Sequence, residues 1–187
     1  KNMSDGISMV FSRMDSVAST EESLVRVLHV SDIHNNPTAF DFTKQIVNNF
    51  DVDFVIDTGD ITDYGTILED IVIKNLSDLP VPYIFVAGNH DSPNTIKMLS
   101  DIGNVTVLDG EMINVKGINI LGFPDTRSKT LNIESSDDDD NIKLGLAIKE
   151  KLYALDEKPD ILAVHDPDAS RSSIGLVPII LNGHVHK

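Results

Sequence analysis

Five short apolar stretches of this sequence are each followed at once by carboxylate, imidazole or amide side chains. The stretches with their polar ends read VLHVSDIH, FVIDTGD, FVAGNHD, ILAVHD and IILNGHVH. Packing does not explain such groups, because burying an unpaired amide or charge costs about 1–3 kcal/mol or more on protein mutational scales. In open α/β sheets, ligands bind beyond the carboxyl ends of the strands. The repeated pattern therefore predicts one functional site built from several strand ends.

Histidine is concentrated at these strand ends. Of the six histidines, five follow an apolar stretch, and His29 lies inside one, so we expect His29 to be a packed or edge residue rather than a ligand. Imidazole, carboxylate and amide oxygen together suit Mn, Fe or Zn, and the absence of Cys excludes a thiolate zinc site. Asp32 and His34 are two residues apart, so an extended strand would place both on one face. His184 and His186 have the same spacing.

Apolar stretches and helical patterns alternate along the first hundred residues, which predicts a parallel sheet. We expect helices at 37–49, 65–79, 93 to about 103, and 141–155, with Asn36 and Ser92 as N-caps. We expect strands at 25–30, 53–58, 82–87, 105–108, 112–115, 118–122, 161–164 and 178–181, the fifth and sixth forming a hairpin. Residues 1–24 are interpreted as a tail or linker and residues 25–187 as one domain.

The polar ends also form an ordered set of motifs. DIH, GDITD, GNHD, a lone histidine and GHVH follow one another between about residues 26 and 186. This set resembles the calcineurin-like metallophosphoesterases, whose pattern is D-x-H, G-D-x-x-D, G-N-H-D/E, H and G-H-x-H. The resemblance implies an α/β fold, a four-layer αββα sandwich of two mixed sheets flanked by helices. Because the family fold normally continues past the last motif, the chain is either C-terminally truncated or an unusually short domain.

The resemblance also implies the roles of individual residues. One metal ion would be held by Asp32, His34, Asp60 and His186, and a second by Asp60, Asn89, His165 and His184, with Asp60 bridging the two. His90 would lie beside the metals to protonate the leaving oxygen or stabilise negative charge, and Asp91 would orient it. Asp63, the last residue of GDITD, would either orient a metal-bound histidine or cap the next helix.

The implied chemistry is hydrolysis of a small phosphate ester. Two divalent ions lower the pKa of bound water and clamp both oxygens of an in-line displacement, so a metal-bridging hydroxide would attack phosphorus directly. Mn is the favoured metal, with Fe or Zn as alternatives, and a phosphodiesterase is favoured over a phosphomonoesterase. One alternative is a catalytically silent interaction scaffold of the same fold. The other is a metal-dependent hydrolase of another bond, such as an amide.

Charge and length limit the partners. The net charge of −15 over 187 residues argues against nonspecific nucleic-acid or anionic-membrane binding through the bulk surface. A phosphate substrate stays compatible, because exposed charges are screened over about 8 Å at physiological salt. Four consecutive aspartates, 137–140, are interpreted as a solvated loop rather than a cation site.

The sequence leaves the compartment and the oligomeric state open. No apolar run reaches the roughly 18–20 residues of a membrane span. Lys1 is not an initiator methionine, however, so a signal or anchor upstream of it is not excluded. A cytoplasmic enzyme and the soluble part of a membrane-anchored protein therefore fit the sequence equally well.

Overall fold

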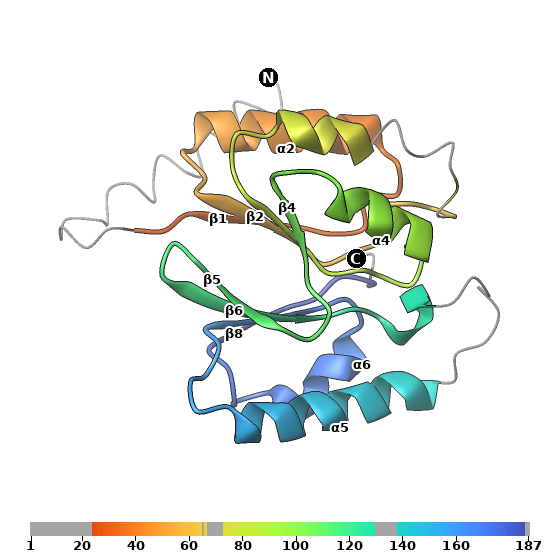
Figure 1. Ribbon diagram of the computed structural model, residues 1–187, viewed down its shortest axis with the longest axis vertical. Helices are drawn as coiled ribbons and strands as arrows, with labels where there is room; N and C mark the ends of the chain where they lie inside the picture. Colours follow the sequence, from red (N-terminus) through yellow and green to blue (C-terminus); the bar gives the residue numbers. More distant parts are fainter. Residues whose placement is uncertain (1–23, 65, 67–72, 130–137, 186–187) are drawn as a thin grey trace.

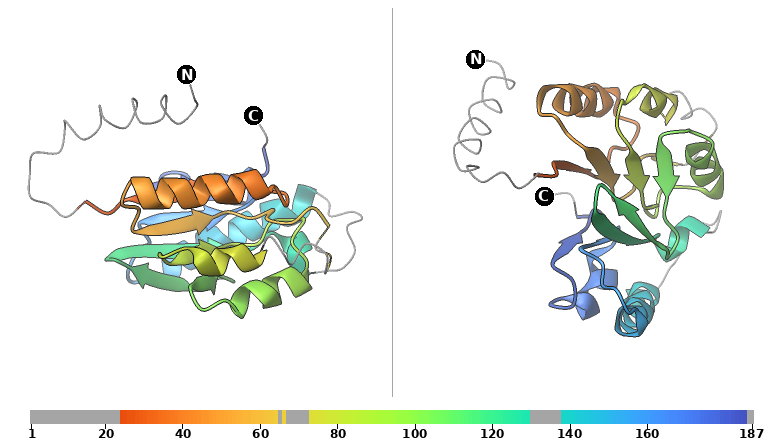
Figure 2. Two further views of the ribbon diagram at one scale, coloured as in Figure 1. Left: turned by 90° about the horizontal axis from the view of Figure 1, so that it is seen from above. Right: turned by 60° about the vertical axis from the view of Figure 1, so that its left-hand side comes forward.

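Two sheets face each other in the middle of the molecule, and helices cover their outer sides (Figure 1). The computed structural model describes residues 24–64, 66, 73–129 and 138–185. Helices α2 (Pro37–Asn49) and α4 (Pro93–Ser100) lie over one sheet, and α5 (Asp138–Ala154) and α6 (Pro167–Ser170) over the other, as Figure 2 also shows. The expected four-layer α/β sandwich is confirmed.

The first sheet joins β1 (Val27–Val30), β2 (Phe54–Asp57), β3 (Tyr83–Phe85) and β4 (Val105–Val107) in that order. All of its pairings are parallel, where a mixed sheet was expected. The helical crossovers explain this, since parallel neighbours need a long connection that returns the chain to the same end of the sheet. Two of these crossovers are α2, between β1 and β2, and α4, between β3 and β4.

The second sheet is mixed and joins β5 (Met112–Val115), β6 (Ile118–Phe123), β7 (Ile161–Val164) and β8 (Ile179–Leu181). The predicted hairpin is confirmed as the antiparallel pair β5–β6, and β6–β7 and β7–β8 are parallel. Three strands of this sheet therefore end on the same side, so the residues that follow them come close together.

Both helix caps in the first half were predicted correctly. The Asn36 side chain accepts the N–H of Thr38 at 3.0 Å at the start of α2, and Ser92 accepts the N–H of Thr95 at 3.2 Å at the start of α4. α4 ends at Ser100, before the predicted end near Gly103.

The predicted loop at 137–140 and the predicted helix at 65–79 differ from the structure or lie outside the described residues. α5 begins at Asp138, so Asp138–Asp140 belong to a helix rather than to a loop. Asp137 lies outside the described residues, as does most of the helix predicted at 65–79. In the described part of that segment, residues 73 and 74 are helical, and Asn75–Asp78 form the 3₁₀ helix η3.

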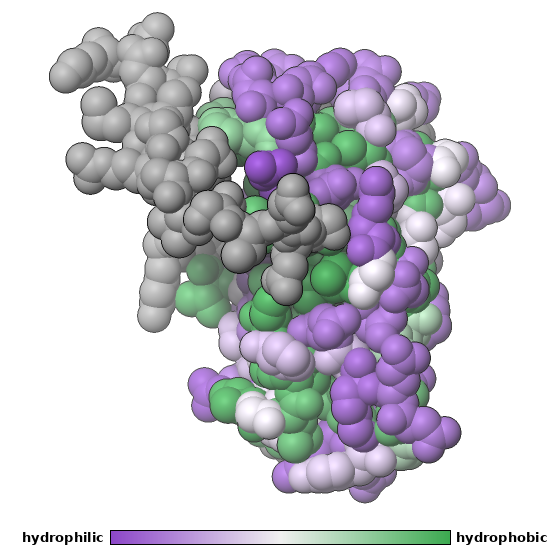
Figure 3. All heavy atoms as spheres, turned by 90° about the vertical axis from the view of Figure 1, so that its left-hand side faces the viewer, coloured by the Kyte–Doolittle hydropathy of each residue, from purple (hydrophilic) through white to green (hydrophobic). Residues whose placement is uncertain are grey.

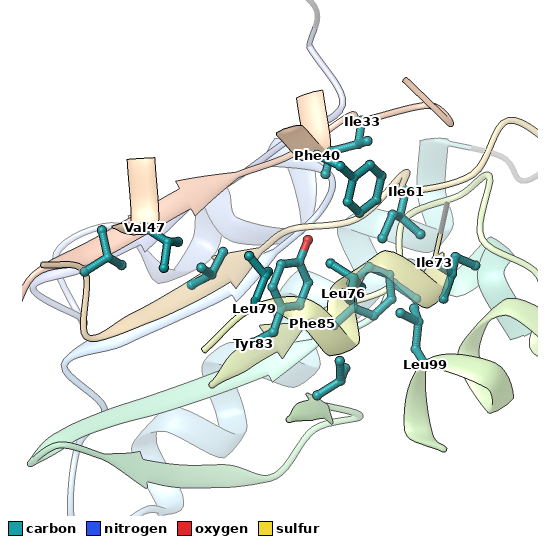
Figure 4. Close-up of a cluster of buried hydrophobic side chains, with 14 residues drawn as sticks. Ile33, Phe40, Val47, Ile61, Ile73, Leu76, Leu79, Tyr83, Phe85 and Leu99 are labelled. Carbon is teal, nitrogen blue, oxygen red and sulfur yellow. The ribbon is translucent and has the colours of Figure 1, made fainter. Parts of the chain in front are cut away.

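Alternate side chains of the central strands pack on opposite sides of the first sheet. Phe54 and Ile56 of β2 point into the layer between the two sheets, and Val55 packs under α2 and α4. Figure 4 shows this second cluster, to which Tyr83 contributes its ring. Since the strand interiors serve packing in this way, the polar residues gather just beyond the strand ends.

The outer strands leave some hydrophobic surface. Figure 3 shows hydrophobic residues in the middle of one side, below the hydrophilic surface at the top. β1 and β8 are edge strands, and Leu24 next to β1 and Ile179 in β8 are 60% and 49% exposed. Among the described residues, the structure has no helix that is both long and apolar enough to cross a bilayer.

Candidate metal centre

The candidate residues lie where strands of both sheets end. Asp32 and His34 follow β1, and Asp60 follows β2, whereas His165 and His184 follow β7 and β8 of the second sheet. One contact joins the two sheets here, because the backbone N–H of His184 donates to both carboxylate oxygens of Asp32 at 3.1 Å. Residues far apart in the sequence thus form a single site.

The backbone turns sharply at four of these residues. φ is +54° at Asp32, +46° at His34, +58° at Asp60 and +68° at His184, in the left-handed region that residues other than Gly rarely adopt. Such conformations cost about 1–3 kcal/mol each and persist where the surroundings hold them. The prediction that Asp32 and His34 share one face of an extended strand is therefore wrong. β1 ends at Val30, and a turn brings both side chains toward Asp60.

Two groups of ligand atoms meet at Asp60. The ligand atoms of Asp32, His34 and Asp60 lie within 4.8 Å of one another, and so do those of Asp60, His165 and His184. Asp60 is only 1% exposed, and its Oδ2 lies 3.1 Å from Nε2 of His165 and 3.9 Å from Nε2 of His34. Two groups of nitrogen and oxygen donors that share a carboxylate fit a pair of divalent transition-metal ions.

The protein fixes two of the histidines from behind. Nδ1 of His34 lies 3.0 Å from Oδ1 of Asp63, and Nδ1 of His165 lies 2.7 Å from the carbonyl oxygen of Thr58. In each ring, Nε2 is then the nitrogen left toward the shared carboxylate, and such partners fix both the tautomer and the orientation of a ligand. Of the two roles considered for Asp63, orienting a histidine fits this contact, and the helix that it would otherwise cap lies mostly outside the described residues. Oδ1 of Asn89 adds an oxygen 3.1 Å from Nε2 of His165.

Charge at the centre favours a cation beside Asp60. Burial alone would lower the pKa of His165, but the hydrogen bond to Asp60 and its negative charge raise that pKa to about 9. Burial would raise the pKa of Asp60, and the contact with His165 outweighs it and lowers that pKa. Without metal ions, a protonated imidazole therefore lies against the carboxylate, at the place where a metal ion would bind.

His90 and Asp91 are held differently from what we expected. Nδ1 of His90 lies 2.7 Å from the carbonyl oxygen of Asp63, and its ring meets the His34 ring edge-on at 5.1 Å between centroids. The buried carboxylate of Asp91 accepts four backbone N–H groups, those of Asp60, Ile61, Thr62 and Gly88. The expectation that Asp91 orients the imidazole is wrong, because this carboxylate is occupied in holding the GDITD turn.

Two glycines allow the backbone to approach the ligands closely. A Cβ added at Gly88 would lie 2.2 Å from Oδ1 of Asp60, and one added at Gly183 would lie 1.9 Å from Oγ of Ser31 and 2.8 Å from Oδ2 of Asp32. Neither position has room for a larger side chain unless the carboxylates move.

His29 lies near the centre without belonging to it. Nε2 of His29 lies 2.9 Å from Oγ1 of Thr58, and His29 belongs to neither ligand group. His186 lies outside the described residues, so its role stays a prediction. The Thr58 carbonyl and Asp166 were not predicted from the sequence; Oδ2 of Asp166 lies 3.9 Å from Nε2 of His184. Thr58 directly precedes GDITD and Asp166 directly follows the lone histidine, and these positions were the only sequence signals for them.

Comparison with protein families gives one match over nearly the whole described chain. The model of the calcineurin-like phosphoesterases matches residues 25–187. An uncharacterized metallophosphoesterase of Helicobacter pylori is 29% identical over 153 residues, covering 78% of this chain and 39% of the relative. One of Aquifex aeolicus is 24% identical over 176 residues, covering 87% and 63%.

A third relative is the DNA double-strand break repair protein Mre11 of Saccharolobus solfataricus, 24% identical over 127 residues, covering 54% of this chain and 33% of the relative. The chain thus spans between 33% and 63% of the length of these relatives. A solved structure described as a novel archaeal phosphodiesterase has a TM-score of 0.50 at 15% identity, covering 83% of this chain and 81% of that chain. Another has a TM-score of 0.65 at 12% identity, covering 86% and 84%. The solved structures share the fold.

Proposed function

The chain belongs to the calcineurin-like phosphoesterase family, and from that premise we propose that it hydrolyses phosphate esters with two divalent cations. The observation that carries the proposal is the Asp60 carboxylate, which is common to both ligand groups. We assign one cation to Asp32, His34, Asp60 and His186, and the other to Asp60, Asn89, His165 and His184.

The two cations, when bound, would activate a water molecule for in-line attack and neutralise charge on the phosphate. The protein contributes the positions of the donors. Asp63 and the Thr58 carbonyl direct two imidazoles toward Asp60, and Asp91 keeps the Asp60 backbone in its turn.

We assign proton handling to His90. Because a carbonyl oxygen only accepts hydrogen bonds, the contact with Asp63 places a proton on Nδ1 of His90. When the ring carries a second proton, on Nε2, that nitrogen would protonate the leaving oxygen or stabilise developing negative charge.

A small phosphodiester is the proposed substrate, and Mn²⁺ the proposed metal, with Fe or Zn as alternatives. Mixed nitrogen and oxygen donors suit all three metals. A solved structure that shares the fold is described as a phosphodiesterase. The net charge of −15 opposes binding along an extended nucleic acid, which leaves small diesters as the substrate class.

Initial rates on bis-p-nitrophenyl phosphate and on p-nitrophenyl phosphate test the proposal, with Mn²⁺ and after chelation. Mn²⁺-dependent turnover of the diester with little of the monoester is the expected result. Faster turnover of the monoester would overturn the diesterase assignment. No turnover of either compound by protein that holds metal would favour the silent scaffold of the same fold.

A further inference from the structure

The third described histidine of the centre, His184, also has a carboxylate near one of its ring nitrogens. Behind His34 lies the Asp63 carboxylate, and behind His165 lies the Thr58 carbonyl. For His184, the group in this position is Asp166, whose Oδ2 lies 3.9 Å from Nε2. This is an ion-pair distance rather than a hydrogen-bond distance, so the contact is mainly electrostatic.

His184 needs such a partner more than the other two rings do. Its side chain is 36% exposed, against 21% for His34 and 0% for His165. Its ring packs edge-on against His165, with 5.1 Å between centroids. A metal site depends on ligands held in place by their surroundings, and this imidazole is the most exposed of the three.

The Asp166 carboxylate is itself held from three elements. Its Oδ1 accepts the N–H of Asp168 at 2.8 Å and caps α6. Its Oδ2 accepts from Nδ2 of Asn141 in α5 at 2.7 Å and from the guanidinium of Arg127 in the 3₁₀ helix η4 (Thr126–Lys129) at 3.3 Å. Arg127 is anchored in turn by two hydrogen bonds of 2.8 Å to the buried Asp125.

The Asp166 oxygen nearest His184 is Oδ2, the same oxygen that Asn141 and Arg127 hold in place. Capping α6 uses only Oδ1. The cap therefore does not explain why Oδ2 is held beside an imidazole. Metal-ligating histidines commonly face a carboxylate, a carbonyl or water on the nitrogen away from the metal.

We infer that Asp166 is a positioning residue for His184: it holds Nε2 on its own side, leaves Nδ1 as the nitrogen for the cation, and so sets the affinity of the second cation site. The inference rests on the proposed function, since it needs a cation at that site. It also connects α5 and η4 to the centre, because each supplies a donor to the Asp166 carboxylate.

Calorimetric titration of the metal-free full chain with Mn²⁺ tests this inference. Asp166→Ser is the variant of choice because serine retains the helix cap through its hydroxyl and removes the second oxygen. The expected result is two sites in the unchanged protein, and in the variant a 10- to 100-fold weaker affinity at one of them. The visible spectrum of Co²⁺-loaded protein should change at the same time, since it reports the ligand geometry.

Asp168→Asn is the matched control, because it removes a neighbouring carboxylate that pairs with Arg171 at 2.9 Å instead. It should leave both Mn²⁺ affinities and the Co²⁺ spectrum unchanged. If Asp166→Ser lowers the melting temperature of the metal-free protein, Asp166→Asn, which keeps the shape of the side chain, replaces it in the titration.

Two outcomes overturn the inference. One is unchanged affinity at both sites in the Asp166 variant, and the other is equal weakening by Asp168→Asn. An unchanged protein that binds no Mn²⁺ in the same titration would instead contradict the proposed function itself, so the two failures are distinguishable.

Discussion

Asp91 holds the backbone of Asp60: its Oδ2 accepts the Asp60 N–H at 2.8 Å, while its Oδ1 accepts the N–H of Ile61 at 3.0 Å. The last residue of GNHD thus fixes Asp60, the second residue of GDITD, in its left-handed turn, where φ is +58°. Asp60 returns the contact, since its Oδ1 accepts the backbone N–H of His90 at 2.8 Å. The two motifs are one interlocked structure.

Replacing Asp91 should therefore weaken both the fold and the centre. We expect Asp91→Asn to lower the free energy of unfolding by about 1–3 kcal/mol, because buried N–H groups lose their acceptor, and to lower Mn²⁺ affinity as the Asp60 turn relaxes. Urea unfolding and calorimetry measure the two effects, with Asp101→Asn on an exposed position as the control. An unfolding midpoint equal to that of the control would contradict the role given to Asp91.

Cation binding and proton handling should separate in two variants. Asp60→Asn removes the charge that both ligand groups share, so Mn²⁺ content and activity should fall together. His90→Ala should leave Mn²⁺ content unchanged and lower kcat about 10²- to 10⁴-fold, the range typical for a general acid or base. Metal analysis and steady-state rates on the diester distinguish the two. Equal loss of metal in both variants would refute this division.

The glycine before Asn89 should tolerate no side chain. A Cβ at Gly88 would lie 2.2 Å from Oδ1 of Asp60, so Gly88→Ala should displace that carboxylate and lower Mn²⁺ affinity at least tenfold. Gly103→Ala is the control, because nothing lies within 4 Å of a Cβ added there. If both alanine variants bind Mn²⁺ equally well, the close packing against Asp60 is not needed for the centre.

Stability should depend on pH through a buried carboxyl beneath the site. Asp57 ends β2, and its Oδ2 lies 2.6 Å from the phenol oxygen of Tyr83. Burial raises the pKa of Asp57 to about 8, although the hydrogen bond from Tyr83 acts in the opposite direction. Between about pH 4 and 8 the unfolded chain has lost this proton while the folded protein keeps it, so the free energy of unfolding falls as pH rises.

The slope from this one group is at most about 1.4 kcal/mol per pH unit. Asp57→Asn cannot ionise and should gain stability relative to the unchanged protein as pH increases across that window. Urea unfolding of both proteins at pH 5, 6, 7 and 8 measures the difference. A constant difference between them would show that Asp57 ionises equally in both states.

Most of the fold and most residues of the centre could be predicted from the sequence. The backbone conformations that bring those residues together could not. Apolar stretches and caps such as Asn36 carry local signals, and they placed the strands and α2 well. The left-handed backbone at Asp32 and His34 has no such signal, because Gly is absent there and the turn depends on contacts with β2, such as the bond from the Asp32 N–H to the Gly59 carbonyl.

The residues that hold the ligands and the neighbouring backbone in place were equally hard to predict from the sequence. The resemblance implied that Asp91 orients His90, whereas in the structure this buried carboxylate accepts backbone N–H groups of Asp60 and Gly88. For Asp63, the contact with His34 fits one of its two predicted roles, while the helix that it would otherwise cap lies mostly outside the described residues.

The bond between His184 and the Asp32 carboxylate spans 152 positions of the chain, and this has a consequence for synthesis. Asp32, His34 and Asp60 leave the ribosome long before β7 and β8 exist, so a nascent first sheet carries one ligand group while the other lacks both of its histidines. Until β8 has been made, the growing chain holds only part of the centre. The second group of donors can therefore assemble only after His184 has joined the ligands of the first sheet.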